Sequence, residues 1–120
     1  MMTRLNWAIP VGSLLHTMQK HDIALAAVFD GEDTNRLNAA MQHTRRKEAV
    51  GIITSVDESK LYVSYGGKSG WVHIILGNDP DELAADWAGD GMLGMLLNTA
   101  IDEYNNRWAD RSCPVTAEAE

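Results

Sequence analysis

Few side chains in this sequence have a spacing that would support metal binding or catalysis. The four histidines are His16, His21, His43 and His73. Ligands on one helix face lie four residues apart, whereas His16 and His21 are five apart, about 140° around a helix. No cysteine or carboxylate cluster accompanies the histidines in the sequence. We therefore expect ordinary surface histidines and no bound metal.

Two further patterns are excluded by their surroundings. Cys113, the single cysteine, is flanked by serine and proline near the end of the sequence, where a positioned catalytic base is rarely available. Residues 67–69 (Gly-Lys-Ser) look like part of a phosphate-binding loop. That motif needs a glycine where Tyr62 stands, and it needs a helix where a strand-like run follows. We expect a hairpin loop there, and no cofactor.

One aromatic group does suggest a binding surface. In the run 71–76, side chains alternate, so Trp71 and His73 face the opposite side of a strand from Val72. If helices cover only the Val72 side, Trp71 and His73 are open to solvent or to a partner, and Tyr62 on the adjacent strand would lie near them. The alternative is that helices cover both faces.

Charge is distributed unevenly along the chain, whose formal net charge is −7. Residues 1–47 carry six Lys or Arg against four Asp or Glu, and residues 48–120 carry four against thirteen. Helix capping explains part of this acidity. We predict an acidic helical face that docks on a basic surface, formed by Asp81, Glu82, Asp86, Asp90, Asp102 and Glu103. The alternative is a solvated acidic helix.

The first half of the chain reads as helical. Apolar residues at helical spacing predict a helix over residues 10–20. The unbroken apolar run 23–29 contains three alanines and follows a potential cap at Asp22, which favours a short helix, with a strand as the alternative. A third, surface helix is predicted over residues 35–47.

The second half begins with period-two patterns and ends with helices. Three β-rich runs between residues 49 and 76, separated by a turn at 57–60 and a loop at 66–70, predict a three-stranded antiparallel meander. Asp79 and Pro80 are typical of a helix start, predicting a helix over 80–89. Asp90 can cap a second helix that ends near Trp108. Residues 113–120 are expected to form a frayed acidic tail.

Segregated helices and strands predict the α+β class. We expect one domain over residues 1–120, with N-terminal helices and two C-terminal helices packed on the sheet. A single cysteine, no Asn-x-Ser/Thr sequence and no long apolar run favour a cytoplasmic protein. The negative charge disfavours direct binding to nucleic acid or anionic membranes.

These observations favour a non-enzymatic module that binds a basic protein surface, such as that of a nucleic-acid-binding protein. In size, acidity and lack of motifs the chain is similar to small phage and plasmid accessory proteins, including anti-CRISPR and antirestriction inhibitors. One alternative is a small enzyme or ligand-binding domain with a cleft between the sheet and the C-terminal helix, where Asp86 or Asp102 lies near His73. Another is a homo-oligomer that buries its exposed aromatic residues between subunits.

Overall fold

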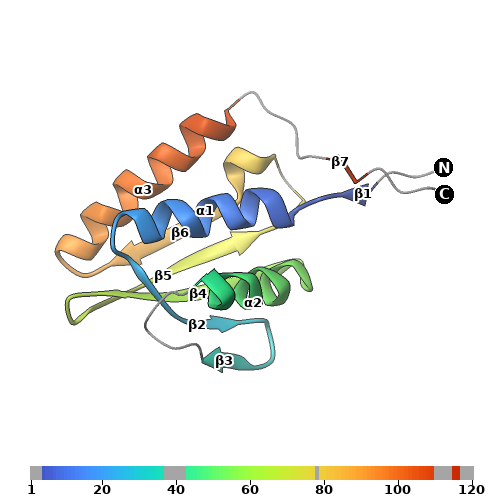
Figure 1. The fold of residues 1–120 in the computed structure, drawn as a ribbon. Coiled ribbons are helices and arrows are strands. Elements are labelled where there is room, and N and C mark those ends of the chain that lie inside the picture. The colour runs from blue at the N-terminus through green and yellow to red at the C-terminus, as the bar shows by residue number, and fades with distance from the viewer. Residues whose placement is uncertain (1–3, 37–42, 78, 110–114, 117–120) are drawn as a thin grey trace.

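The structure, a computed structural model, describes residues 4–36, 43–77, 79–109 and 115–116 and confirms the α+β class (Figure 1). Its elements in chain order are β1 (Arg4–Leu5), α1 (Ala8–Lys20), β2 (Ala24–Phe29), β3 (Thr34–Arg36), α2 (His43–Thr54), β4 (Glu58–Tyr65), β5 (Lys68–Ile75), the 3-10 turn η1 (Pro80–Glu82), β6 (Ala84–Gly89), α3 (Met92–Trp108) and β7 (Val115–Thr116).

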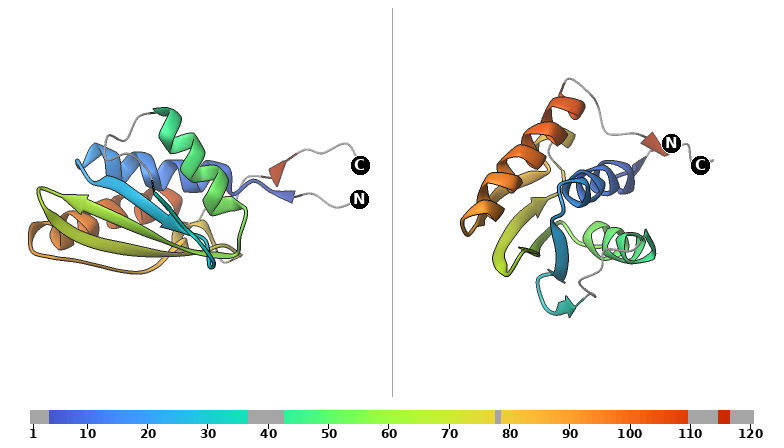
Figure 2. Two further views of the ribbon diagram at one scale, coloured as in Figure 1. Left: turned by 90° about the horizontal axis from the view of Figure 1, so that it is seen from below. Right: turned by 60° about the vertical axis from the view of Figure 1, so that its left-hand side comes forward.

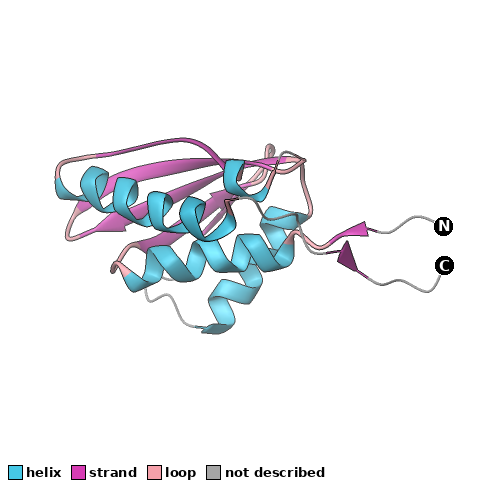
Figure 3. Ribbon diagram, turned by 90° about the horizontal axis from the view of Figure 1, so that it is seen from above, coloured by secondary structure: helices cyan, strands magenta, loops and turns pink. Residues whose placement is uncertain are grey.

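Five of the strands form one antiparallel sheet in the order β3-β2-β4-β5-β6, and β1 pairs with β7 in a separate two-stranded ladder. Helix α1 packs against α2 and α3, and α3 also packs on the sheet. All three helices lie on the same side of the sheet (Figures 2 and 3). The opposite face of the sheet is therefore left without a helical layer in the described part of the chain.

The core lies between the helices and the sheet. Strands β4 and β5 alternate, so that every second side chain points toward the helices and is buried. The fully buried side chains with the largest volumes come from all these layers: Leu14, Leu15, Met18, Ile23, Leu25, Ile53, Leu61, Ile74, Leu83, Leu93, Leu97 and Tyr104. None of the helices within the described residues is both long and apolar enough to cross a membrane.

Helix α1 confirms the prediction for residues 10–20, but the preference for a helix over 23–29 was wrong. Asp22 does not cap a new helix. It adopts the left-handed conformation (φ 63°), while the amides of Asp22 and Ile23 donate to the carbonyls of Gln19 and Met18. This Schellman arrangement ends α1 and turns the chain directly into β2. Strand β2 is then held on both sides, by β3 and β4.

The predicted helix over 35–47 and the predicted strand that follows it are both displaced. Residues 34–36 form β3, residues 37–42 lie outside the described residues, and α2 runs from His43 to Thr54. The β-branched residues after position 49 suggested a strand, yet Ala49 and Ile53, four apart, are both buried as on a helix face. The hydroxyl of Thr54 donates to the Val50 carbonyl at 2.8 Å, which satisfies it within the helix.

The helix predicted over residues 80–89 was also wrong. Pro80 does begin a helical turn, but the turn is a single 3-10 element without a side-chain cap from Asp79. The chain then enters β6, which pairs along β5. Helix α3 confirms the last predicted helix, with Gly91 rather than Asp90 at its N-cap.

The predicted three-stranded meander is thus partly right. Strands β4 and β5 form the expected hairpin, but the first predicted strand is α2, and β2, β3 and β6 complete a sheet of five. Within the described residues, one α-helix follows the sheet instead of two. Of the predicted tail, Val115–Thr116 forms β7 against β1, and residues 113, 114 and 117–120 lie outside the described part.

Candidate functional site

The register of the central hairpin determines which side chains meet on the sheet. Gly66 and Gly67 form the two-residue turn between β4 and β5, and both have positive φ (54° and 83°). Such a turn matches the twist of the flanking strands and accepts glycine at both positions without strain. With Tyr65 paired to Lys68, every later pair in the ladder is set.

Two cross-strand rows result on the face opposite the helices. One row runs Phe29, Lys60, His73, Asp86 through β2, β4, β5 and β6, and the other places Tyr62 opposite Trp71 and Trp71 opposite Ala88. We call this surface the open face and define it by Phe29, Lys60, Tyr62, Trp71, His73 and Asp86. The burial pattern agrees, because the alternating residues Leu61, Val63, Val72 and Ile74 are buried on the helix side.

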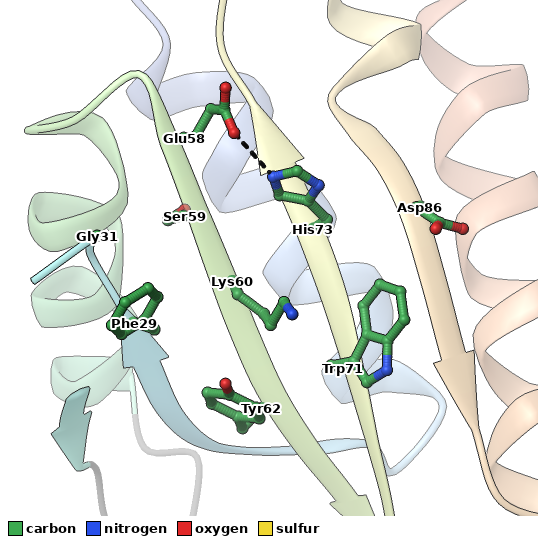
Figure 4. A pocket seen from close by; sticks show the side chains of 9 residues that line it. All are labelled: Phe29, Gly31, Glu58, Ser59, Lys60, Tyr62, Trp71, His73 and Asp86. Atoms are coloured by element: carbon green, nitrogen blue, oxygen red, sulfur yellow. Dashed lines mark hydrogen bonds and ion pairs between the residues drawn. The ribbon is translucent and has the colours of Figure 1, made fainter. Parts of the chain in front are cut away.

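A cation–π contact lies at the centre of the open face. The Lys60 ammonium is 4.9 Å from the centroid of the Trp71 ring (Figure 4). A cation at this distance over an indole is attracted by the negative face of the ring. Lys60 forms no ion pair with any residue in the described part of the chain, so the ring is its principal partner there.

Two acidic side chains, Glu58 beside the open face and Asp86 within it, differ in their partners. Glu58 Oε2 lies 3.1 Å from His73 Nε2, and the two form an ion pair when the imidazole is protonated. Asp86 is exposed, and its Oδ1 accepts the backbone amide of Trp87 at 2.9 Å. Asp86 has no basic side chain within ion-pair distance among the described residues, which leaves its carboxylate available to an external group.

The open face contains two neighbouring hollows that share Tyr62 and Trp71. The first has a volume of about 340 Å³ and is lined by Phe29, Gly31, Glu58, Ser59, Lys60, Tyr62, Trp71, His73 and Asp86 (Figure 4). The second, of about 400 Å³, is lined by Tyr62, Ser69, Gly70, Trp71, Ala88, Gly89 and Asp90. An aromatic centre with a few polar groups at its rim is the usual composition of a binding site.

The first hollow contains two hydroxyls, which could act as nucleophiles only with a base beside them. Of its lining residues, Ser59 and Tyr62 carry hydroxyls, and neither is hydrogen-bonded to His73 or to a carboxylate. The Ser59 hydroxyl is buried without a hydrogen-bond partner. Nucleophilic catalysis needs a hydroxyl or thiol held by a base, and these residues do not supply that pair.

The structure does bring together the three predicted aromatic-site residues Tyr62, Trp71 and His73. It does not assemble the six predicted acidic residues into one helical face. Glu82, Asp86 and Asp90 were expected one helical turn apart, but they lie in η1, in β6 and in the turn before α3. Of the six acidic residues, Asp86 belongs to the open face and lines the first hollow, and Asp90 lines the second hollow. Their role in binding a partner stays a prediction.

Asp102 and Glu103 lie on α3, on the helix side of the sheet. Asp102 is exposed, but Glu103 accepts Lys20 at 2.7 Å, His21 at 3.0 Å and Arg107 at 3.4 Å. The hydrogen bond from Lys20, with that from His21, lowers the pKa of Glu103 to about 2. Glu103 therefore ties the end of α1 to α3, and its charge is already matched within the chain.

Asp81 and Glu82 both lie in η1, which is not part of the open face. Together with Asp79 they place carboxylate oxygens within 4.8 Å of one another, and they are the only such group of three potential metal ligands among the described residues. Asp81 and Glu82 also line a hollow of about 370 Å³ beside Trp87 and Asn105. This is the region between the sheet and the C-terminal helix, but neither Asp102 nor His73 lines it.

Two residues of the open face were missed by sequence reasoning. Phe29 belonged to a run interpreted as helix, and Lys60 to a predicted turn at 57–60 that is in fact the start of β4. Extending the period-two pattern of Tyr62 and Ser64 back by one step would have placed Lys60 on the same face. Phe29 had no such signal, because the apolar run around it is unbroken.

A scan of family models finds none that matches this chain, and no curated protein and no solved structure matches it either.

Proposed function

We propose that this chain is a non-enzymatic module that binds a basic surface of another protein through the open face of its sheet. The contact surface differs from the acidic helices suggested by the sequence. The expected partner class is unchanged: a protein with clustered Lys and Arg, as proteins that bind nucleic acid have.

The observation that carries the proposal is the Tyr62–Trp71 pair on the face opposite the helices. Tyr62 is 39% exposed, and the pair borders both hollows. Tyr and Trp are enriched among residues that dominate binding energy, because each covers a large area with few rotatable bonds. Trp71 is half-buried beside Tyr62, so the pair offers a partly exposed aromatic surface, which supports a role in recognition.

The charge around the aromatic pair supports a basic partner. Glu58, Asp86 and Asp90 line the two hollows, and Lys60 is the only Lys or Arg among the described residues that does. The whole chain has a formal net charge of −7, of the same sign as these carboxylates. Complementary charge steers association and excludes partners of the same sign, such as nucleic acid itself.

The test is affinity capture from a lysate of the host, comparing the wild-type chain with a Tyr62→Thr/Trp71→Thr variant. Threonine keeps the strand propensity of both positions while removing the aromatic surface. We expect a basic protein that the wild type retains at low salt, that elutes as salt rises, and that the double variant fails to retain.

The matched control is Asp102→Asn, which removes one exposed charge on α3 without touching the open face. We expect this control to capture the same partner as the wild type. A partner retained equally by the double variant would refute the proposal, and so would capture that Asp102→Asn abolishes. Self-association of the wild type that the double variant loses would instead identify the open face as a contact between copies of the chain.

A further inference from the structure

We propose that the first hollow binds the guanidinium group of a single arginine of the partner, stacked on Trp71 and paired with the Asp86 carboxylate. This inference rests on the proposed function and names the group that the open face recognises. It follows from three features of the described structure: the cation over Trp71, the available carboxylate of Asp86, and the register that places them near each other.

The face of the Trp71 ring already holds a cation. The Lys60 ammonium lies 4.9 Å from the ring centroid and has no carboxylate partner among the described residues. Lys60 is a long, flexible side chain, both it and Trp71 are half-buried, and a single cation–π contact near the surface is weak. An external cation with additional contacts can therefore displace Lys60 from the ring.

Asp86 supplies the additional contact. It lies opposite His73 in the β5–β6 ladder, and Trp71 is two residues before His73 on the same face. Diagonal neighbours of this kind are about 7–8 Å apart, within reach of one long side chain that contacts both. Glu58 is a poorer candidate because it already pairs with His73 at 3.1 Å.

Arginine fits this pair better than lysine does. Its planar guanidinium can stack on an indole and can donate two parallel hydrogen bonds to a carboxylate, whereas an ammonium acts as a point charge. Arg is also the more frequent partner of aromatic rings. A ring and a carboxylate side by side on one rigid sheet face thus match the two recognition modes of arginine.

A single-stranded nucleic acid is the competing occupant, since bases stack on exposed aromatic residues and Lys60 could meet a phosphate. The carboxylates of Glu58, Asp86 and Asp90 oppose it electrostatically. The two occupants predict opposite effects of removing Lys60. A guanidinium competes with the Lys60 ammonium, so Lys60→Met should tighten its binding, whereas loss of a phosphate contact should weaken nucleic-acid binding.

The experiment is an NMR titration that follows the indole N–H resonance of Trp71, assigned with Trp71→Phe. The probe is the peptide acetyl-Gly-Arg-Gly-amide, with matched peptides carrying citrulline or lysine in place of arginine. Citrulline keeps the planar shape and removes the charge. We expect the arginine peptide to bind about fivefold more tightly than the citrulline peptide, the upper range for a charge that gains an exposed ion pair.

Three variants sharpen the test. Asp86→Asn should weaken arginine-peptide binding about fivefold, the upper range for an exposed ion pair, and Asp102→Asn should leave it unchanged. Lys60→Met should tighten it about threefold, because the competing cation–π contact is removed. An amide spectrum unchanged outside the open face would show that each variant keeps its fold.

Equal affinity for arginine and citrulline, or weaker binding in Lys60→Met, would overturn the inference. So would an oligothymidylate that binds wild type and is weakened by Lys60→Met. Partner capture that still depends on Tyr62 and Trp71 would in those cases leave the proposed function intact. Arginine-peptide binding without any aromatic-dependent partner would instead remove the proposed function and leave the guanidinium site.

Discussion

Tyr62 on β4 lies directly opposite Trp71 on β5, on the face of the sheet away from the helices, while their neighbours Leu61 and Val72 lie opposite each other in the core. The hairpin thus presents one pair of aromatic side chains outward and the adjacent pair of aliphatic side chains inward. The inward pair is fully buried, whereas Tyr62 is 39% exposed and Trp71 is half-buried. The inward face of these strands therefore contributes most to stability, and the recognition that we propose would use the outward face.

Adjacent residues of β4 should respond very differently to truncation. Leu61 has no exposed surface, so Leu61→Ala should lower the free energy of unfolding by about 2–5 kcal/mol. Tyr62→Thr should lower it by less than about 1 kcal/mol, since threonine suits a strand and Tyr62 is 39% exposed. Urea unfolding of both variants checks this. Comparable losses would mean that Tyr62 is part of the core.

Two helical glycines should respond in opposite directions to alanine. A Cβ on Gly94 in α3 would lie 2.6 Å from the Gly89 carbonyl oxygen, a backbone atom that cannot move aside freely. Gly94→Ala should therefore destabilise by about 1–3 kcal/mol, despite the better helix propensity of alanine.

Gly51 in α2 is the matched control, because a Cβ there meets nothing within 4 Å. Gly51→Ala should stabilise by about 0.4–1 kcal/mol by restricting the unfolded chain. Thermal unfolding of the two variants side by side is the measurement. A stabilised Gly94→Ala would contradict the close approach of α3 to the end of β6.

The turn η1 should depend on one buried hydroxyl. Tyr104 is fully buried on α3, and its hydroxyl donates to the Pro80 carbonyl at 2.7 Å. Tyr104→Phe removes this hydrogen bond, while the Pro80 carbonyl still accepts the Leu83 amide at 3.2 Å, and should cost about 0.5–1.5 kcal/mol in urea unfolding. Tyr62→Phe removes an exposed hydroxyl and should change stability little. Equal effects would show that the Pro80 contact does not hold η1 on α3.

The elements that could be predicted are those with a clear period of their own. Helix α1 and the β4–β5 hairpin have it, and the placement of Trp71 and His73 on one face, opposite Val72, followed from alternation in β5. The elements that were predicted wrongly depend on partners distant in sequence. Strand β2 is alanine-rich and becomes a strand between β3 and β4, and α2 is β-branched and becomes a helix against α1.

The predicted acidic helical face does not form, for the same reason. Asp86 was selected as part of a helix, but it reaches the open face because β6 pairs with β5, which charge spacing alone does not reveal. Glu103 looked free in the sequence, yet Lys20 and His21, more than eighty residues earlier, lie beside it. Charge counts along a chain take no account of such pairing across the fold.

The Glu103 cluster predicts a specific acid dependence of stability. Hydrogen bonds from Lys20 and His21 lower its pKa from the usual 4.5 to about 2 in the folded chain. A carboxyl with a lowered folded-state pKa stabilises the fold above its unfolded pKa, and this contribution is lost as pH falls from about 4.5 to about 2. Arg107 on the same helix also lies 3.4 Å from this carboxylate.

Glu103→Gln should therefore lower stability at neutral pH and flatten the decline of stability between about pH 4.5 and pH 2. Asp102→Asn, at the adjacent exposed position on α3, is the matched control and should leave that decline as steep as in the wild type. Urea unfolding at several pH values across this window measures both slopes. An unchanged slope in Glu103→Gln would mean that the contacts with Lys20 and His21 do not hold the carboxylate in its charged form.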